Sequence, residues 1–165
     1  MKKGFILFVL AVMLLVSGCG GKEEPADPNV VDLTAALDTY IQKEISDGES
    51  LPLIQRLQND ILREITHQIL SYDMEDETMI VEFTYVDVLA LADSITDPEL
   101  TEENYYRYCI ERISARQCKM ITEEIEVSFE SSAEGFSVIS SEPLANVLSG
   151  GVLYYYLEML EGIAS

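Results

Sequence analysis

The first nineteen residues constrain the chain most, because they decide in which compartment the rest of it folds. Lys2 and Lys3 precede an unbroken apolar run over residues 5–16, and two small residues, Ser17 and Gly18, stand directly before Cys19. This order is typical of a secretory signal. The run is shorter than the roughly 20 apolar residues of a membrane-spanning helix. We therefore predict that residues 1–18 are removed and that the remainder folds outside the cytoplasm.

The segment Val16-Ser17-Gly18-Cys19 resembles the lipobox of bacterial lipoproteins. The resemblance implies that the thiol of Cys19 carries a diacylglyceryl group and that Cys19 becomes the first residue of the mature chain. The protein would then be lipid-anchored on the extracytoplasmic face of the cell membrane, since two or three acyl chains give stable anchoring where one does not. The alternative is an ordinary secretory signal in which Cys19 is incidental. We expect residues 19–29 to be a tether and residues 30–165 to form one domain.

Charge restricts the partners that this domain can meet. Loss of the signal leaves 8 of the 10 basic residues against all 30 acidic ones, a formal net charge of −22. Such a charge repels nucleic acid and anionic lipid headgroups, so we expect no nucleic-acid partner and a membrane contact made only through Cys19. One histidine and three cysteines provide no metal-ligand spacing, and we predict neither a metal nor a cofactor.

Apolar residues recur every fourth position at the start of the domain, which is typical of amphipathic helices. The first such stripe predicts a helix over residues 30–45. A second predicts a helix that begins after Ser50 and continues through residue 69, so that the domain opens with a helical hairpin. His67 would lie on the polar side of the second helix as a solvated surface residue. The two stripes consist of Leu33, Leu37, Ile41 and Ile45, and of Leu53, Leu57, Ile61, Ile65 and Ile69.

The pattern then changes to alternation, which predicts strands. The acidic residues Asp73, Glu75, Asp76 and Glu77 lack the ligand spacing of a calcium loop and indicate a solvated turn. A strand is expected over residues 78–91, and residues 121–130 alternate so regularly that one face of the sheet must lie in water. A turn at residues 131–135 leads to a strand over residues 136–139, which predicts a hairpin.

A helix starting at Asp97-Pro98 or at Thr101 separates the two strand regions, with Tyr106, Cys109, Ile110, Ile113 and Met120 as its inner stripe. Arg112, Arg116 and Lys119 share one face of that helix, either as internal ion pairs or as a docking patch. On one helix, Cys109 and Cys118 would lie about 13.5 Å apart along the axis, too far for a disulfide. A bridge stays open only if Cys118 lies beyond the helix end.

Ser141 and Pro143 mark the start of a final helix. At Gly150-Gly151 either this helix breaks or another backbone packs closely against it, because two glycines cost about 2 kcal/mol of helix propensity. The three tyrosines at positions 154–156 cannot all face one way, so at least one hydroxyl is available to solvent or a pocket.

The order of elements predicts an α+β fold in which helices pack on one face of a small antiparallel sheet. The segments Val81–Asp87 and Phe136–Gly151, with the glutamate-alternating strand between them, resemble small Gram-positive lipoproteins that have a nuclear-transport-factor-two-like, cystatin-like α+β cone. The chain departs from that family in having no tryptophan and fewer predicted strands. The resemblance implies a concave sheet face.

Three functions fit these features. The first is a non-catalytic module that binds a small ligand or a protein partner in the concave face, lined by tyrosines such as Tyr85 and Tyr155. The second is a structural component of an envelope complex, with Arg112, Arg116 and Lys119 as its interface. The third is an enzyme in which burial raises the pKa of Asp87 toward that of a general base. No nucleophile-and-base motif accompanies Asp87, so we predict a binding module rather than an enzyme.

Overall fold

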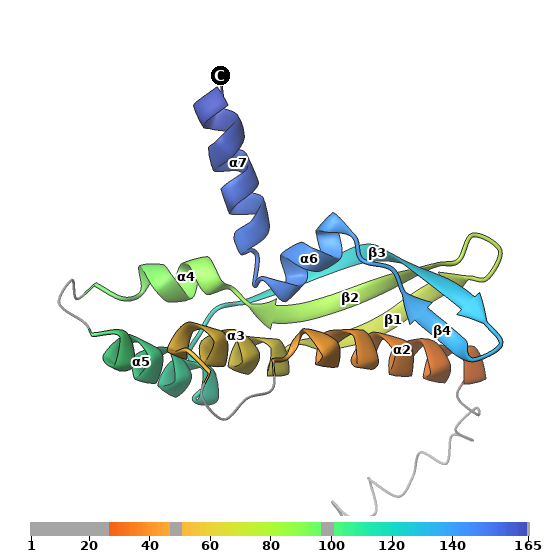
Figure 1. Ribbon diagram of the computed structural model, residues 1–165, viewed down its shortest axis with the longest axis horizontal. Helices are drawn as coiled ribbons and strands as arrows, with labels where there is room; N and C mark the ends of the chain where they lie inside the picture. The colour runs from red at the N-terminus through yellow and green to blue at the C-terminus, as the bar shows by residue number, and fades with distance from the viewer. Residues whose placement is uncertain (1–26, 47–50, 97–100, 165) are drawn as a thin grey trace, which may run out of the picture.

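The computed structural model describes residues 27–46, 51–96 and 101–164. In these residues helices pack against an open four-stranded antiparallel sheet of order β1-β2-β3-β4, which confirms the predicted α+β class (Figure 1). Cys19, most of the tether and Ser50 lie outside the described residues. The elements are α2 (Pro28–Glu44), α3 (Leu53–Arg63), β1 (Thr66–Asp73), β2 (Thr78–Val86), α4 (Val88–Asp93), α5 (Glu102–Ser114), β3 (Met120–Ser132), β4 (Gly135–Val138), α6 (Glu142–Leu148) and α7 (Val152–Ala164).

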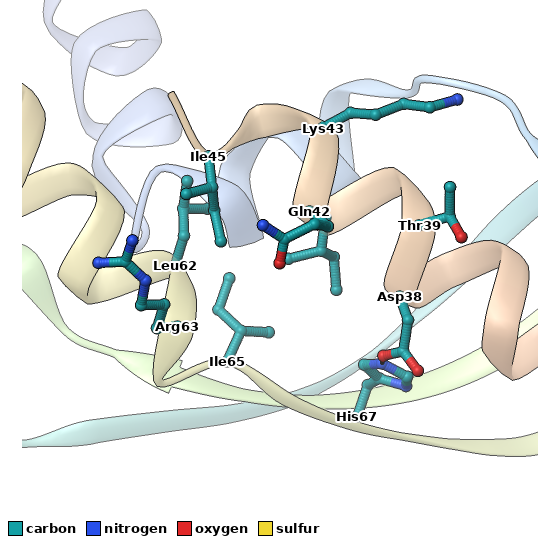
Figure 2. A pocket seen from close by; sticks show the side chains of 10 residues that line it. Asp38, Thr39, Gln42, Lys43, Ile45, Leu62, Arg63, Ile65 and His67 are labelled. Carbon is teal, nitrogen blue, oxygen red and sulfur yellow. Dashed lines mark hydrogen bonds and ion pairs between the residues drawn. The ribbon is translucent and has the colours of Figure 1, made fainter. Parts of the chain in front are cut away.

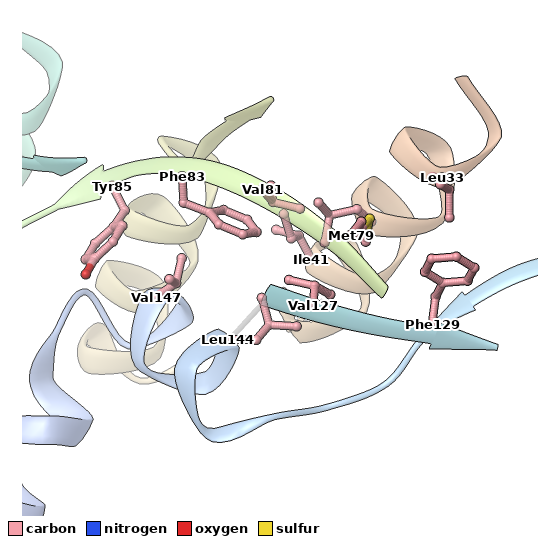
Figure 3. Packing of buried hydrophobic residues seen from close by; sticks show 11 residues of the cluster. Leu33, Ile41, Met79, Val81, Phe83, Tyr85, Val127, Phe129, Leu144 and Val147 are labelled. Atoms are coloured by element: carbon pink, nitrogen blue, oxygen red, sulfur yellow. The ribbon is translucent and has the colours of Figure 1, made fainter. Parts of the chain in front are cut away.

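The main core lies between the inner face of the sheet and helices α2 and α6 (Figure 3). The predicted apolar stripe of α2 lies directly on this face. The helical conformation brings these apolar residues to one side, where they are buried together, and this burial stabilises the helix. The expected open concave face is therefore filled by the protein's own side chains. The buried residues are Leu33, Leu37 and Ile41 of α2, Met79, Val81, Phe83 and Tyr85 of β2, Val127 and Phe129 of β3, and Leu144 and Val147 of α6.

The outer face of the sheet is polar, as the alternation in β3 predicts. Thr122, Glu124 and Glu126 are exposed, whereas Val127 and Phe129 on the opposite face are buried. Glu82 of β2 stands directly across from Glu124. Two like charges in this position repel each other, and water on this face screens the repulsion. The predicted hairpin is also present, since β3 pairs with β4 from Phe129↔Val138 to Ser132↔Gly135.

The second predicted helix is too long. It ends at Arg63, and residues 66–73 form the edge strand β1, which pairs with β2. A spacing of four residues is ambiguous here, because it is close to one helical turn and is also twice the strand period. Ile65 and Ile69 therefore keep their inward direction on an extended chain, and His67 between them points inward as well. The prediction of a solvated histidine on a helix is wrong for this reason.

Two further boundaries differ from the prediction. β2 ends at Val86, and Asp87 caps helix α4, so the expected strand to residue 91 is wrong in its last part. Helix α5 begins after the Thr101 cap but ends at Ser114, and Met120 lies on β3 rather than on the helix. Arg116 has a left-handed backbone with φ +53°, which turns the chain away from the helix. Cys118 lies beyond the helix end, so the two cysteines do not share one helix as that argument assumed, and both are free thiols in the structure.

At Gly150-Gly151 both predicted alternatives hold. The helix breaks there, with φ +67° at Gly150 and +83° at Gly151, values that favour glycine. The carbonyl of Gly150 also accepts a hydrogen bond from the Val88 amide at 3.1 Å. A Cβ at position 150 would lie 2.3 Å from Val88 Cγ2 and 2.9 Å from the Val86 carbonyl oxygen. The junction between α6 and α7 is therefore attached to the end of β2.

The two glycines allow backbone strain to be separated from steric contact. We expect Gly150→Ala to lower the free energy of unfolding by about 1–3 kcal/mol more than Gly151→Ala, because the left-handed backbone is common to both and only position 150 meets backbone and side-chain atoms. At position 151 the new Cβ would make ordinary contacts of 3.4 and 3.9 Å. Urea unfolding followed by circular dichroism measures the difference, and equal losses would contradict the packing described here.

Candidate functional site

A groove of about 620 Å³ lies between α2, the end of α3 and the start of β1 (Figure 2). It exists because α2 packs mainly against β4 and has few contacts with β1. The end of α3 at Arg63 closes it at one side. Its lining residues are Asp38, Thr39, Ile41, Gln42, Lys43 and Ile45 of α2 and its C-cap, Leu62 and Arg63 of α3, Ile65, and His67 of β1.

His67 is the most unusual residue in the groove. Its side chain is 8 % exposed, and its Nε2 lies 2.9 Å from Oδ1 of Asp38 on α2. A carboxylate can only accept, so Nε2 carries the hydrogen of this bond. The other ring nitrogen, Nδ1, is buried and has no hydrogen-bond partner among the described residues. A buried polar atom without a hydrogen-bond partner lowers the folding stability by about 1–3 kcal/mol. Such atoms are rare in folded proteins and often lie at functional sites.

The groove combines an apolar floor with a polar rim. Ile41, Ile45 and Leu62 form the floor, while Gln42 and Lys43 are exposed on the rim. In Figure 2 the side chain of Gln42 lies over the gap toward Leu62 and Ile65. This arrangement suits a ligand that places an apolar group on the floor and a polar group at the rim. Ligand pockets usually have this mainly apolar lining with a few polar side chains.

Sequence reasoning missed this site, although part of the signal was available. His67 is two residues from both Ile65 and Ile69. If this segment had been assigned as a strand, the alternation of side chains would have predicted that His67 points toward the core. Asp38, Gln42 and Arg63 carried no such signal, because their proximity depends on how α2 and α3 lie against the sheet.

Two of the predicted site residues, Asp87 and Lys119, meet elsewhere, at the end of the sheet. The ammonium of Lys119 lies 2.8 Å from Oδ2 of Asp87, and Oδ1 accepts a hydrogen bond from the Ala90 amide at 2.9 Å. Burial opposes ionisation of this carboxyl, but the hydrogen bonds from Lys119 and Ala90 outweigh it and hold the pKa of Asp87 below its usual range. The expectation that burial raises this pKa is wrong, and Asp87 is a helix cap with an ion-pair partner.

Tyr85 does not line an open pocket. The residue is buried, and its hydroxyl donates a hydrogen bond to Oε1 of Glu123 at 2.7 Å. Burial, together with the neighbouring carboxylate, raises the pKa of Tyr85 well above its usual range. Tyr155 is exposed on α7, far along the chain from the groove residues.

The predicted basic face is divided among different elements. The guanidinium of Arg112 lies 4.8 Å from the centre of the Tyr108 ring, and Lys119 is paired with Asp87. Arg116 lines a separate cavity of about 270 Å³ beside Cys118. Because α5 ends at Ser114, these three cations do not form one helical surface.

Comparison of the chain with protein-family models, curated proteins and solved structures returned no match. Among residues 27–46, 51–96 and 101–164, no helix has the length and apolar character needed to cross a membrane. The same part of the chain brings together no group of three or more histidine, cysteine, aspartate or glutamate side chains that could hold a metal ion.

The structure predicts that the imidazole of His67 is not required for folding. We expect His67→Phe to change the free energy of unfolding by less than about 1 kcal/mol, because the ring shape is kept beside Phe83 and the unpaired nitrogen is removed. His67→Ala should lose about 2–4 kcal/mol by leaving a cavity. Urea unfolding distinguishes the two, and a large loss in His67→Phe would show that the Asp38 bond supports the fold.

The Asp87 carboxylate should contribute an acid-sensitive part of stability. Because its pKa is lowered by folding, the contribution is present above the unfolded value of about 3.9 and is lost as the pH falls through the folded value. Asp87→Asn should keep the cap but reduce this acid dependence, and Asp87→Ala should cost about 1–2 kcal/mol at neutral pH. Urea titrations at several pH values test this, with Asp93→Asn on the same helix as the control; an unchanged acid dependence in Asp87→Asn would contradict it.

Proposed function

We propose that this chain is a lipid-anchored extracytoplasmic protein whose groove between α2, α3 and β1 binds an apolar group of a ligand or partner. The observation that carries the binding role is the groove itself, with its apolar floor and the nearly buried His67 in its wall. The anchor part of the proposal comes from Lys2, Lys3, the apolar run and the lipobox-like residues before Cys19. The likeness to the cone-shaped lipoprotein family is part of the same proposal.

The groove supports a binding role better than the cluster at the end of the sheet does. Asp87 pairs with Lys119 and the Ala90 amide, and the Tyr85 hydroxyl pairs with Glu123, so these polar groups are used in holding the fold. In the groove, Nδ1 of His67 has no partner among the described residues. That nitrogen is itself closed to solvent, so a ligand would meet the apolar floor and the rim side chains of the groove.

The anchor is tested by intact mass spectrometry of the full-length chain expressed with its own signal and extracted from bacterial membranes. We expect a mature chain that begins at Cys19 and carries a diacylglyceryl mass. Cys19→Ala should lack that mass, whereas Cys118→Ala should retain it. A secreted, unlipidated wild-type chain would show that Cys19 is incidental to an ordinary signal.

The groove is tested with 3-(4-hydroxyphenyl)propionate, which combines an aromatic ring with a carboxylate. We expect binding of roughly millimolar affinity, because one small group fills only part of the space. Isoleucine-methyl nuclear magnetic resonance locates the probe: Ile41, Ile45 and Ile65 should shift, while Ile54 and Ile139 should not. Gln42→Trp should block the groove, and Gln55→Trp on an exposed part of α3 is the control. Shifts confined to other methyl groups would refute this assignment.

A further inference from the structure

Strand β1 is an edge of the sheet, and its outer side has no strand beside it among the described residues. The strand order is β1-β2-β3-β4, so β1 pairs with β2 alone in this sheet. None of the backbone hydrogen bonds that join separate elements within residues 27–46, 51–96 and 101–164 involves residues 66–73. Proteins commonly protect such an edge with lysine or proline. β1 contains neither residue, so this edge is open to another extended backbone.

The register of the sheet shows which backbone groups face this open edge. The amide of Asp87 donates to the carbonyl oxygen of Lys119 at 2.9 Å, and these two residues continue the β2–β3 register as a directly opposed pair. The odd-numbered residues of β2 are therefore bonded to β3, and the even-numbered ones are bonded to β1. His67 stands across from the odd-numbered Phe83, and Ile69 follows two positions later in the same register. The amide and carbonyl groups of His67 and Ile69 therefore point toward the open edge.

The same stretch of β1 borders the groove. The side chain of His67 points from β1 toward Asp38 of α2, in the wall of the groove (Figure 2). A strand added to β1 would lie about 4.8 Å from it. A residue paired with His67 would place its side chain on the same face of the sheet as the imidazole ring, which is the face of the groove. The groove floor there consists of Ile41, Ile45 and Leu62. One extended segment can thus bond to the edge and fill the groove.

The charges of the sheet favour a basic partner. The four strands contain no lysine or arginine, and the outer face of the sheet carries Glu82, Glu124 and Glu126. Every second side chain of an added strand would lie on this acidic face. A second copy is a poor occupant, because its own β1 brings no cation and two copies of so acidic a chain repel each other. The inward side chains of that copy, Ile65 and Ile69, already pack against its own core.

We propose that the groove and the open edge of β1 together bind an extended, basic peptide segment of another protein, which joins the sheet as a further strand. An apolar side chain opposite His67 fills the groove, and lysine or arginine side chains of the segment lie on the outer face. The inference rests on the proposed binding role of the groove and names its partner. The register of β1 shifts between Ile69 and Ser71, so the regular edge is short and the added strand is short as well.

The probe is the peptide Ac-Lys-Val-Thr-Tyr-Thr-Val-Lys-NH2. In an extended conformation its apolar side chains share one face, and its lysines and threonines share the other. Titration calorimetry on the chain beginning at Gly20, which contains every described residue, measures the affinity. We expect binding at least about tenfold tighter than that of 3-(4-hydroxyphenyl)propionate, because backbone hydrogen bonds to His67 and Ile69 are added.

Methylation of single peptide amides gives the sharpest result. The peptide residue opposite His67 exchanges both backbone hydrogen bonds with it, so N-methylation of the central tyrosine should weaken binding at least about tenfold. N-methylation of either neighbouring threonine should change the affinity less than about twofold, because those amides point away from β1. Equal effects at tyrosine and threonine would overturn the proposal, since a side chain held by the groove alone does not require this alternation.

Amide hydrogen exchange locates the peptide on the protein. At saturating peptide, the amides of His67 and Ile69 should exchange at least about tenfold more slowly, because they become hydrogen-bonded. Phe136 and Val138 of β4, on the opposite edge of the sheet, are the matched control and should not change. Protection confined to β4 would overturn the proposal. Protection of His67 and Ile69 in a dimer without peptide would also overturn it, in favour of a second copy.

Two further variants connect the edge to the groove and to charge. Gln42→Trp should weaken peptide binding about tenfold, as loss of the groove contact requires, and Gln55→Trp should not. Replacing both peptide lysines with glutamate should weaken binding about fivefold at low salt, and an equal affinity would overturn the choice of a basic partner. If the peptide does not bind while 3-(4-hydroxyphenyl)propionate does, the strand-addition inference fails and the proposed function stands; if neither binds, both fail.

Discussion

The packing of α2 on the inner face of the sheet is the interaction on which the rest of the molecule depends. Leu33, Leu37 and Ile41 are buried against Phe83 and its neighbours, and this removes the largest apolar surface of the sheet from water. The same helix covers the sheet face on which a concave ligand site was expected. Since α2 lies nearer β4 than β1, the remaining space is a groove along its flank, and this is where the unsatisfied chemistry is found.

In the part of the chain that the structure describes, the molecule holds a satisfied polar cluster at the end of the sheet and one unsatisfied polar atom in the wall of the groove. At the end of the sheet, Asp87 meets Lys119 and the Ala90 amide, while the Tyr85 hydroxyl meets Glu123. Each group there has a partner, so the cluster holds α4 and the start of β3 in place. In the groove, His67 uses one nitrogen and leaves the other unpaired among the described residues. Satisfied groups stabilise the fold, and an unsatisfied one is a reason to look for a ligand.

Local sequence patterns predicted the secondary structure correctly where a single hydrophobic period dominated. The alternation of residues 121–130 predicted both the strand and its wet face, and the Ser141 cap marked a helix start correctly. Thr101, one of two starts left open for its helix, is the cap that the structure has. Local patterns predicted the wrong element at Ile65 and Ile69, where the helical and strand periods coincide. They also predicted too long a strand where an apolar, β-branched run continues past the end of β2 into α4. Arg116 also hid a helix end, because a left-handed backbone at a residue other than glycine has no clear sequence signal.

The sequence by itself determined the buried stripe of α2, the alternation of β3 and the strongly acidic character of the chain, and it limited Gly150-Gly151 to a helix break or a close backbone contact. These properties follow from side-chain periodicity, backbone freedom and composition, which act over a few residues. Only the tertiary structure decided that His67 meets Asp38, 29 residues away, and that Lys119 meets Asp87, 32 residues away. Such contacts depend on strand register and on the placement of helices across the sheet, and no local pattern specifies either one.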